Sequence, residues 1–156
     1  MTAYTDVLQD KYSICYYDCQ ELAGIDLKLT AETDIHPAFV NGGIQRAVEN
    51  LCSLEKGNLT VLAFSIGGTI AWKAALQGLK IKTLFALSST RLRYETEKPP
   101  CDLTLAFGER DKHKPNQAWF DKHAIVPVIF EGMHHEMYMS GDVAKRFGED
   151  LNRLIQ

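Results

Sequence analysis

The sequence has little net charge and lacks any apolar run long enough to cross a membrane. Its 156 residues carry 17 Lys and Arg against 20 Asp and Glu, a formal net charge of −3. This balance gives no strong attraction to nucleic acid or to an anionic membrane. The most apolar stretch, 61–76, contains Ser65, two glycines and Lys73, and it is shorter than the ~20 apolar residues that a membrane helix needs. We therefore expect no nucleic-acid partner and no membrane partner, so any binding preference must come from a local site.

The sequence also offers no pattern for export and no paired cysteines. Its first ten residues contain two aspartates instead of the basic and then apolar pattern of a signal peptide, so we expect a cytoplasmic protein. No C-x-x-C pair is present, and a chain of this length needs no disulfide framework. We expect reduced thiols at all four cysteines, Cys15, Cys19, Cys52 and Cys101. Cys15 and Cys52 are predicted to lie in the core, where free cysteine is usually found.

Apolar runs of strand length alternate with segments of helical periodicity along the chain, the pattern expected of an α/β fold. We predict one domain over residues 1–156, a three-layer, doubly wound, mostly parallel sheet of about six strands with helices on both faces. The predicted strands are short and rich in aliphatic and aromatic residues. They are 12–17, 25–29, 59–64, 81–87, 102–107 and 125–130.

Three helices follow from apolar periodicity. Residues 44–54 and 143–154 each present one apolar face. Residues 67–78 are apolar nearly all round, so we place this helix centrally on the sheet, with Gly78 as its C-terminal cap. The polar segment 88–100 ends in two prolines and is predicted to be a flexible insertion, too short to form a cap domain.

Residues 63–68, Ala-Phe-Ser-Ile-Gly-Gly, lie where the predicted strand 59–64 passes directly into the apolar helix. They resemble the nucleophile elbow of the α/β-hydrolase superfamily, G-x-S-x-G, in which small residues flank the serine because the turn is tight. Ala63 stands in place of the first glycine. The resemblance implies that Ser65 is a nucleophile and that the N–H of Ile66 donates to an oxyanion. The alternative is an ordinary serine at a helix N-terminus, where serine is a favoured cap.

Asp111 is the candidate acid of this site. It follows the predicted strand 102–107 in the segment Gly-Glu-Arg-Asp, at the carboxyl end of a strand, where open α/β sheets build their sites. The segment resembles the G-x-x-D of the same superfamily, whose carboxylate orients a histidine. Glu109 is the alternative acid, and a solvated loop carboxylate is the alternative role for Asp111.

Two adjacent histidines, His134 and His135, follow the last predicted strand. Imidazole accepts and returns protons near neutral pH, which suits a general base. The run His-Glu-Met-Tyr that starts at His135 is similar to the segment that carries the base in lipases and esterases of the superfamily. His135 is therefore the expected base and His134 the alternative. The order Ser, Asp, His along the chain is also the order that the superfamily uses.

The resemblance covers roughly residues 12–156, with a reduced sheet that lacks the superfamily's first two strands. It implies a capless serine esterase or thioesterase that needs neither a cofactor nor a metal and acts as a monomer or homodimer on a small-molecule or carrier-bound acyl substrate. A second oxyanion donor is expected from the N–H of Asp18 or Cys19, where superfamily members usually carry glycines. Arg91 and Arg93 are either contacts for an anionic substrate or surface charge.

Three other functions compete with this interpretation. A zinc site has enough candidate ligands in the cysteines and in His113, His123, His134 and His135, but no H-E-x-x-H or C-x-x-C spacing supports it. A phosphate or nucleotide site at the glycines 67–68 lacks both G-x-G-x-x-G and a Walker lysine. A hydrolase fold that has lost catalysis and acts as a binding module is the third, because fold alone does not imply activity.

Overall fold

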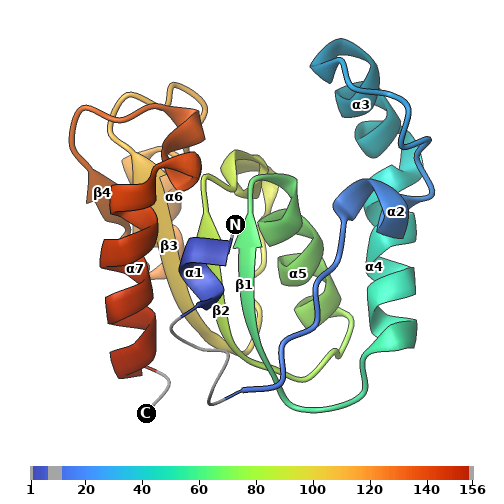
Figure 1. The fold of residues 1–156 in the computed structure, drawn as a ribbon, viewed down its shortest axis with the longest axis horizontal. Coiled ribbons are helices and arrows are strands. Elements are labelled where there is room, and N and C mark those ends of the chain that lie inside the picture. The colour runs from blue at the N-terminus through green and yellow to red at the C-terminus, as the bar shows by residue number, and fades with distance from the viewer. Residues whose placement is uncertain (1, 7–11, 155–156) are drawn as a thin grey trace.

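The protein is described by a computed structural model over residues 2–6 and 12–154 (Figure 1). Its strands are β1 (Leu59–Phe64), β2 (Ile81–Leu87), β3 (Asp102–Gly108) and β4 (Val128–Phe130). Its α-helices are α1 (Thr2–Thr5), α2 (Cys19–Ala23), α3 (Glu32–Ala38), α4 (Ile44–Leu54), α5 (Ile66–Leu76), α6 (Gln117–His123) and α7 (Gly141–Leu154). A kinked helical segment, η1 (Phe39–Gly43), and two 3₁₀ segments, η2 (Thr90–Tyr94) and η3 (His135–Met139), complete the described elements.

All four described strands run parallel in one sheet, in the order β1-β2-β3-β4. Phe64 pairs with Leu87, and Leu87 pairs with Ala106, so neighbouring strands stay in register up to their carboxyl ends. Because parallel strands all end at the same edge, the segments that follow β1, β2, β3 and β4 meet there. Residues far apart in the sequence are thereby brought together at one rim of the sheet.

Helices cover both faces of this sheet, because alternate residues of β2 and β3 point to opposite sides. On one face, α5, η2 and α6 pack against Leu84, Ala86, Leu105 and Phe107, and on the other, α1 and α7 pack against Phe85, Leu87 and Ala106. Helix α4 lies against α5, and α2 lies against α4 (Figure 1). The predicted three-layer α/β fold class is confirmed.

The prediction of about six strands is wrong for the described part of the chain, which has four. The segment 12–17 has no regular secondary structure and pairs with no described strand. Only Ile14 in it is partly buried, whereas the other five side chains are exposed. A strand covered on both faces would bury both sets of alternating side chains. The aromatic residues that suggested a strand therefore lie at the surface instead.

The predicted strand 25–29 is a turn. The side chain of Asp26 accepts a hydrogen bond from the N–H of Lys28 (3.0 Å), and the C=O of Asp26 accepts from the N–H of Leu29 (3.0 Å). An aspartate that bonds its own backbone two residues on competes with strand pairing. The last predicted strand, 125–130, is also shorter than expected, because β4 begins only at Val128.

The helical predictions are confirmed at 44–54, while the central helix runs from Ile66 to Leu76 instead of 67–78. Gly78 has φ +98° and follows the end of α5, so it closes this helix in the left-handed conformation that glycine adopts without strain. The predicted flexible insertion 88–100 is instead packed: it contains η2, and Leu92 in it has no exposed surface. The polar and charged residues around Leu92 gave the segment the composition of an exposed loop, so its one buried leucine was not predicted.

All four cysteines are free thiols, as predicted. Cys15 is exposed, so its predicted core position is wrong, whereas Cys52 is partly buried and packs against the core cluster between α4 and α5. Cys15 lies at the surface because segment 12–17 is not a strand of the sheet. Among the helices of residues 2–6 and 12–154, none carries an apolar stretch that could cross a bilayer.

Gly68 provides a test of how closely α5 packs on the sheet. A Cβ at this position would lie 2.6 Å from the Cβ of Ser89 and 2.9 Å from the Cβ of Ala86. We expect Gly68→Ala to lower the free energy of unfolding by about 1–3 kcal/mol, because the core must shift to admit one methyl group. Gly57→Ala, where nothing lies within 4 Å, should change it by less than ~0.5 kcal/mol. Urea denaturation of both variants checks this, and equal stabilities would contradict the packing.

Candidate active site

Ser65 occupies a strained turn between β1 and α5. Its φ is 48° and its ψ is −119°, a combination that non-glycine residues rarely adopt. The turn is tight, because a Cβ on Gly67 would lie 3.3 Å from the Sγ of Cys19 and 3.7 Å from the Cβ of Ala63. The side chain of Ser65 makes no capping hydrogen bond to α5. The alternative of a simple helix-capping serine therefore does not describe this residue.

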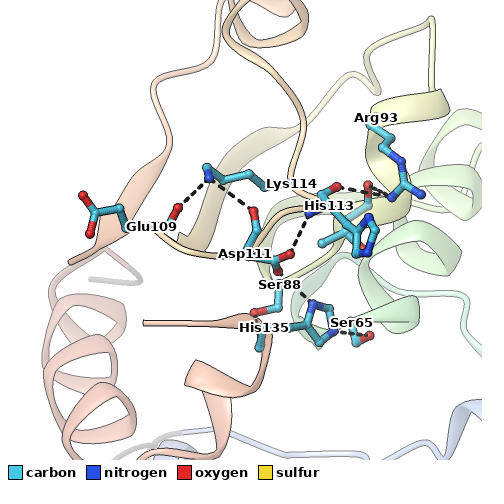
Figure 2. Close-up of polar contacts among 9 residues, drawn as sticks. Ser65, Ser88, Arg93, Glu109, Asp111, His113, Lys114 and His135 are labelled. Carbon is cyan, nitrogen blue, oxygen red and sulfur yellow. Dashed lines mark hydrogen bonds and ion pairs between the residues drawn. The ribbon is translucent and has the colours of Figure 1, made fainter. Parts of the chain in front are cut away.

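The hydroxyl of Ser65 lies beside the imidazole of His135, and that imidazole lies beside Asp111. The Oγ of Ser65 is 3.2 Å from Nε2 of His135, and Nδ1 of His135 is 2.8 Å from Oδ2 of Asp111 (Figure 2). With a proton on Nδ1, the ring donates to the carboxylate and Nε2 is free to accept from the serine. The three residues come from the ends of β1, β3 and β4, which the parallel sheet places at one rim.

The carboxylate of Asp111 is almost fully enclosed, with its residue 3% exposed. A buried carboxylate is stable only when hydrogen-bond donors surround it. One oxygen accepts from His135, and the other, Oδ1, accepts from the backbone N–H of His113 at 3.0 Å. Asp111 is therefore no solvated loop carboxylate, because both of its oxygens are engaged.

The loop that carries Asp111 is fastened by two cationic side chains (Figure 2). Lys114 Nζ donates to the C=O of Glu109 (2.6 Å) and to the C=O of Asp111 (3.2 Å). Arg93 donates to the C=O of His113 (3.2 Å) and to the C=O of Thr90 (2.9 Å). The guanidinium of Arg93 thus joins η2 to the loop after β3.

Arg91 and Arg93 both lie over the ring of Tyr94, with guanidinium carbons 5.0 and 4.3 Å from its centroid. Arg93 also donates to the hydroxyl of Tyr94 at 2.8 Å. Arg93 therefore has a structural use, which the sequence did not indicate. A contact of Arg91 with an anionic substrate stays a prediction.

Glu109, the alternative acid, faces away from the imidazole. Its Oε2 accepts from the N–H of Gly132 at 2.8 Å, which ties the loop after β3 to the loop after β4. The same two loops meet at Gly108, where a Cβ would lie 2.7 Å from the carbonyl carbon of Met133. The N–H of Arg110 donates to the C=O of Met133 at 2.8 Å. Glycine at position 108 is required because the histidine-bearing loop approaches its backbone so closely.

His134 and His135 have different surroundings. His134 is exposed and makes no described side-chain contact, whereas the imidazole of His135 lies between Ser65 and Asp111 with its side chain 34% exposed. Of the two alternatives for the base, only His135 has the geometry to act on Ser65.

The two candidates for the second oxyanion donor lie at the start of α2. The side chain of Asp18 caps this helix by accepting from the N–H groups of Gln20 and Glu21, at 2.7 and 3.2 Å. Cys19 is the first residue of α2, and its Sγ packs beside Gly67, two residues after Ser65. The N-terminus of α2 therefore lies next to the turn that carries Ser65, and no described residue accepts a hydrogen bond from the N–H of Cys19.

The candidate metal ligands do not converge. In the described ranges 2–6 and 12–154, no three His, Cys, Asp or Glu side chains form a group that could hold a metal ion. His123 is buried, packs against Trp119 with ring centroids 4.4 Å apart, and has Nε2 3.3 Å from the C=O of Glu95. His113 is exposed and serves the site through its backbone.

Known structures share this architecture, although no protein-family model matches the chain and no curated protein shows a significant match. A Xanthomonas campestris protein assigned to the α/β-hydrolase superfamily superposes with a TM-score of 0.69 at 19% identity, over 97% of this chain and 88% of that one. An α/β serine hydrolase homologue from Coxiella burnetii superposes with a TM-score of 0.53 at 15% identity, over 94% of this chain and 73% of that one.

A serine hydrolase without a lid, also from Xanthomonas campestris, gives a TM-score of 0.52 at 17% identity, over 72% of this chain and 56% of that one. The chain thus spans little more than half the length of that protein, in keeping with its shorter sheet. The comparisons show that the chain has the α/β-hydrolase fold.

The environment of Cys19 predicts a pH-dependent reactivity. Burial, and then the nearby Asp18 carboxylate, raise the pKa of the Cys19 thiol to about 11. Only the thiolate is alkylated, so at pH 8 roughly one thiol in a thousand is reactive, and the rate should rise about tenfold per pH unit towards pH 11. Iodoacetamide labelling at pH 8, 9 and 10 with peptide mass spectrometry measures this. The exposed Cys15 is the reference, and Cys19 reacting as fast as Cys15 at pH 8 would contradict the burial.

Proposed function

We propose that the protein is a serine hydrolase that cleaves an ester or thioester through an acyl-enzyme on Ser65. His135 is the general base and Asp111 holds its ring in one orientation and tautomer. The proposal is carried by one observation, the hydrogen-bonded chain from Ser65 Oγ through both ring nitrogens of His135 to the buried carboxylate of Asp111. The α/β-hydrolase fold and the strained turn at Ser65 support it.

In the first step, Nε2 of His135 takes the proton from Ser65 as the serine oxygen bonds to the substrate carbonyl carbon. The carbonyl π electrons move to oxygen and form a tetrahedral oxyanion. When the oxyanion collapses, the bond from carbon to the leaving alkoxide or thiolate breaks, and the leaving group takes the proton from Nε2. The products of this step are an alcohol or thiol and the acyl ester of Ser65.

In the second step, a water molecule gives a proton to Nε2 of His135 as its oxygen attacks the acyl carbon. The second oxyanion collapses by breaking the bond to Ser65 Oγ, which takes the proton back from Nε2. A carboxylic acid leaves and the enzyme returns to its starting state. Asp111 stabilises the imidazolium that forms in each step.

The oxyanion needs N–H donors at the rim of the sheet. We assign one to Ile66, the first residue of α5, and the second to Cys19, the first residue of α2, in preference to Asp18. Cys19 is preferred because its side chain contacts Gly67, beside Ser65, while the Asp18 carboxylate is committed to capping α2. Two helix N-termini then face the developing negative charge, and each lost donor costs a factor of ~100 or more in rate.

The acyl substrate is small or carried on a larger partner. One third of the His135 side chain is exposed, which favours a shallow site open to solvent. The segment after β2 forms no cap over the site, because it packs onto the core through the buried Leu92. A shallow site suits short acyl groups or acyl groups presented by a carrier.

Replacing Ser65 with Ala tests the nucleophile. Ser65→Ala should abolish labelling by a fluorophosphonate and lower the turnover of a short p-nitrophenyl ester by on the order of 10⁴- to 10⁶-fold, because no acyl-enzyme can form. Labelling followed by peptide mapping measures the first effect and initial rates the second. Ser53→Ala, at an exposed serine of α4, is the matched control and should label like the wild type.

Label on a residue other than Ser65, or undiminished turnover by Ser65→Ala, would overturn the proposal. A wild-type protein that neither labels nor turns over any ester or thioester would favour the inactive binding module instead.

Replacing the two acids in turn tests the assignment of Asp111. Asp111→Asn should lower kcat by about 10⁴-fold, because an amide that donates to Nδ1 stabilises the wrong tautomer of His135. Glu109→Gln keeps an oxygen that accepts from Gly132, so kcat should stay within a few-fold of the wild-type value. Steady-state kinetics on the same ester distinguish the two. A larger loss in Glu109→Gln than in Asp111→Asn would reverse the assignment.

A further inference from the structure

Ser88, the first residue after β2, has an unusual backbone conformation and no exposed surface. Its φ is +53°, in the left-handed region that favours glycine, asparagine and aspartate. The backbone is held there from both sides: its N–H donates to the C=O of Ala106 (2.8 Å), and its C=O accepts from the N–H of Thr90 (2.9 Å). A strained non-glycine residue that its surroundings hold so firmly points to a function for its side chain.

That side chain bonds to the backbone of His135. The Oγ of Ser88 donates to the C=O of His135 at 2.6 Å, a contact between residues 47 positions apart (Figure 2). Among the described residues, no other element bonds the main chain of His135. The loop before it is fastened at Gly132 and Met133, so Ser88 is the fastening point at the histidine itself.

The positive φ explains how Ser88 reaches this loop. In β2, Ala86 points to the α5 face and Leu87 to the α7 face, so a continued strand would turn residue 88 towards α5. The segment that contains His135 packs on the opposite side, where Met137 joins the α7 cluster. The turn at Ser88 breaks the alternation and lets its hydroxyl meet His135 instead.

We propose that Ser88 is a positioning residue, which holds the backbone of His135 so that its imidazole spans Ser65 and Asp111; this inference rests on the proposed hydrolase function. The bond joins the histidine loop to the end of β2, next to the fully buried Leu87. Ser88 cannot touch substrate, because it has no exposed surface. Its effect is therefore on catalysis through His135 and not on substrate binding.

Ser88→Gly and Ser88→Ala remove the hydroxyl in two ways. Glycine adopts φ +53° without strain, whereas alanine keeps the backbone cost of serine. An equal loss of kcat in both variants is therefore due to the missing hydroxyl and not to a change in backbone strain. We expect kcat for ester hydrolysis to fall by on the order of 10- to 100-fold in both variants, with KM within about twofold of wild type, because a misplacement of ~1 Å in a catalytic group costs this much.

A spectroscopic readout accompanies the kinetics. The ¹H NMR resonance of the Nδ1 proton between His135 and Asp111 should broaden or disappear in both Ser88 variants, because the looser loop lets this proton exchange with water. If Ser88 had a purely structural role, its loss would lower thermal stability but leave kcat, KM and this resonance unchanged.

Ser89→Ala is the matched control. Ser89 is also fully buried, but its Oγ has no hydrogen-bond partner in the described structure. This variant should keep the wild-type kcat and the Nδ1 resonance, and it should be no less stable, because a buried hydroxyl without a partner is removed.

The outcomes distinguish the two proposals. Wild-type kcat in Ser88→Gly or Ser88→Ala, with Ser65→Ala inactive, would reject the role of Ser88 and leave the hydrolase in place. An equal loss of kcat in Ser89→Ala would also reject it. A wild-type protein without labelling or turnover would reject the hydrolase, and the role of Ser88 with it.

Discussion

The site depends on the parallel register of the sheet, which brings the carboxyl ends of all four described strands to one rim. The segment after each strand carries one residue of the site. These residues are Ser65 after β1, Ser88 after β2, Asp111 after β3 and His135 after β4. The residues in this set are separated by up to 70 positions in the sequence, yet they are joined by hydrogen bonds. The hydrophobic contacts on both faces of the sheet fix the positions of the strands, and in this way they also fix the positions of these four residues.

Strain is concentrated at the same rim. Of the three non-glycine residues with positive φ in the described chain, Ser65 and Ser88 both lie immediately after a strand of the sheet and both bond to His135. The hydroxyl of Ser65 lies beside the imidazole of His135, and the hydroxyl of Ser88 donates to the backbone C=O of the same histidine. The buried, hydrogen-bonded strand ends stabilise these conformations against relaxation.

Much of the fold was predictable because its signals are local. The strands 59–64, 81–87 and 102–107 are mostly apolar, as is typical of strands covered on both faces, and helix 44–54 has one apolar face. The segments 12–17 and 25–29 were mispredicted for opposite reasons. The first is rich in β-forming residues but finds no pairing partner, and in the second an aspartate closes a turn inside an alternating pattern.

The sequence by itself determined the turn at Ser65, since small residues on either side of a serine between a strand and a helix are a local steric requirement. It also determined the order in which the serine, the acid and the histidine follow the strands. Only the tertiary structure placed Asp111 rather than Glu109, and His135 rather than His134, in the hydrogen-bonded chain with Ser65, and only it showed which residues fasten the loops. Ser88, Gly108 and Arg93 act through contacts with segments distant in sequence, and such contacts exist only once the sheet has assembled.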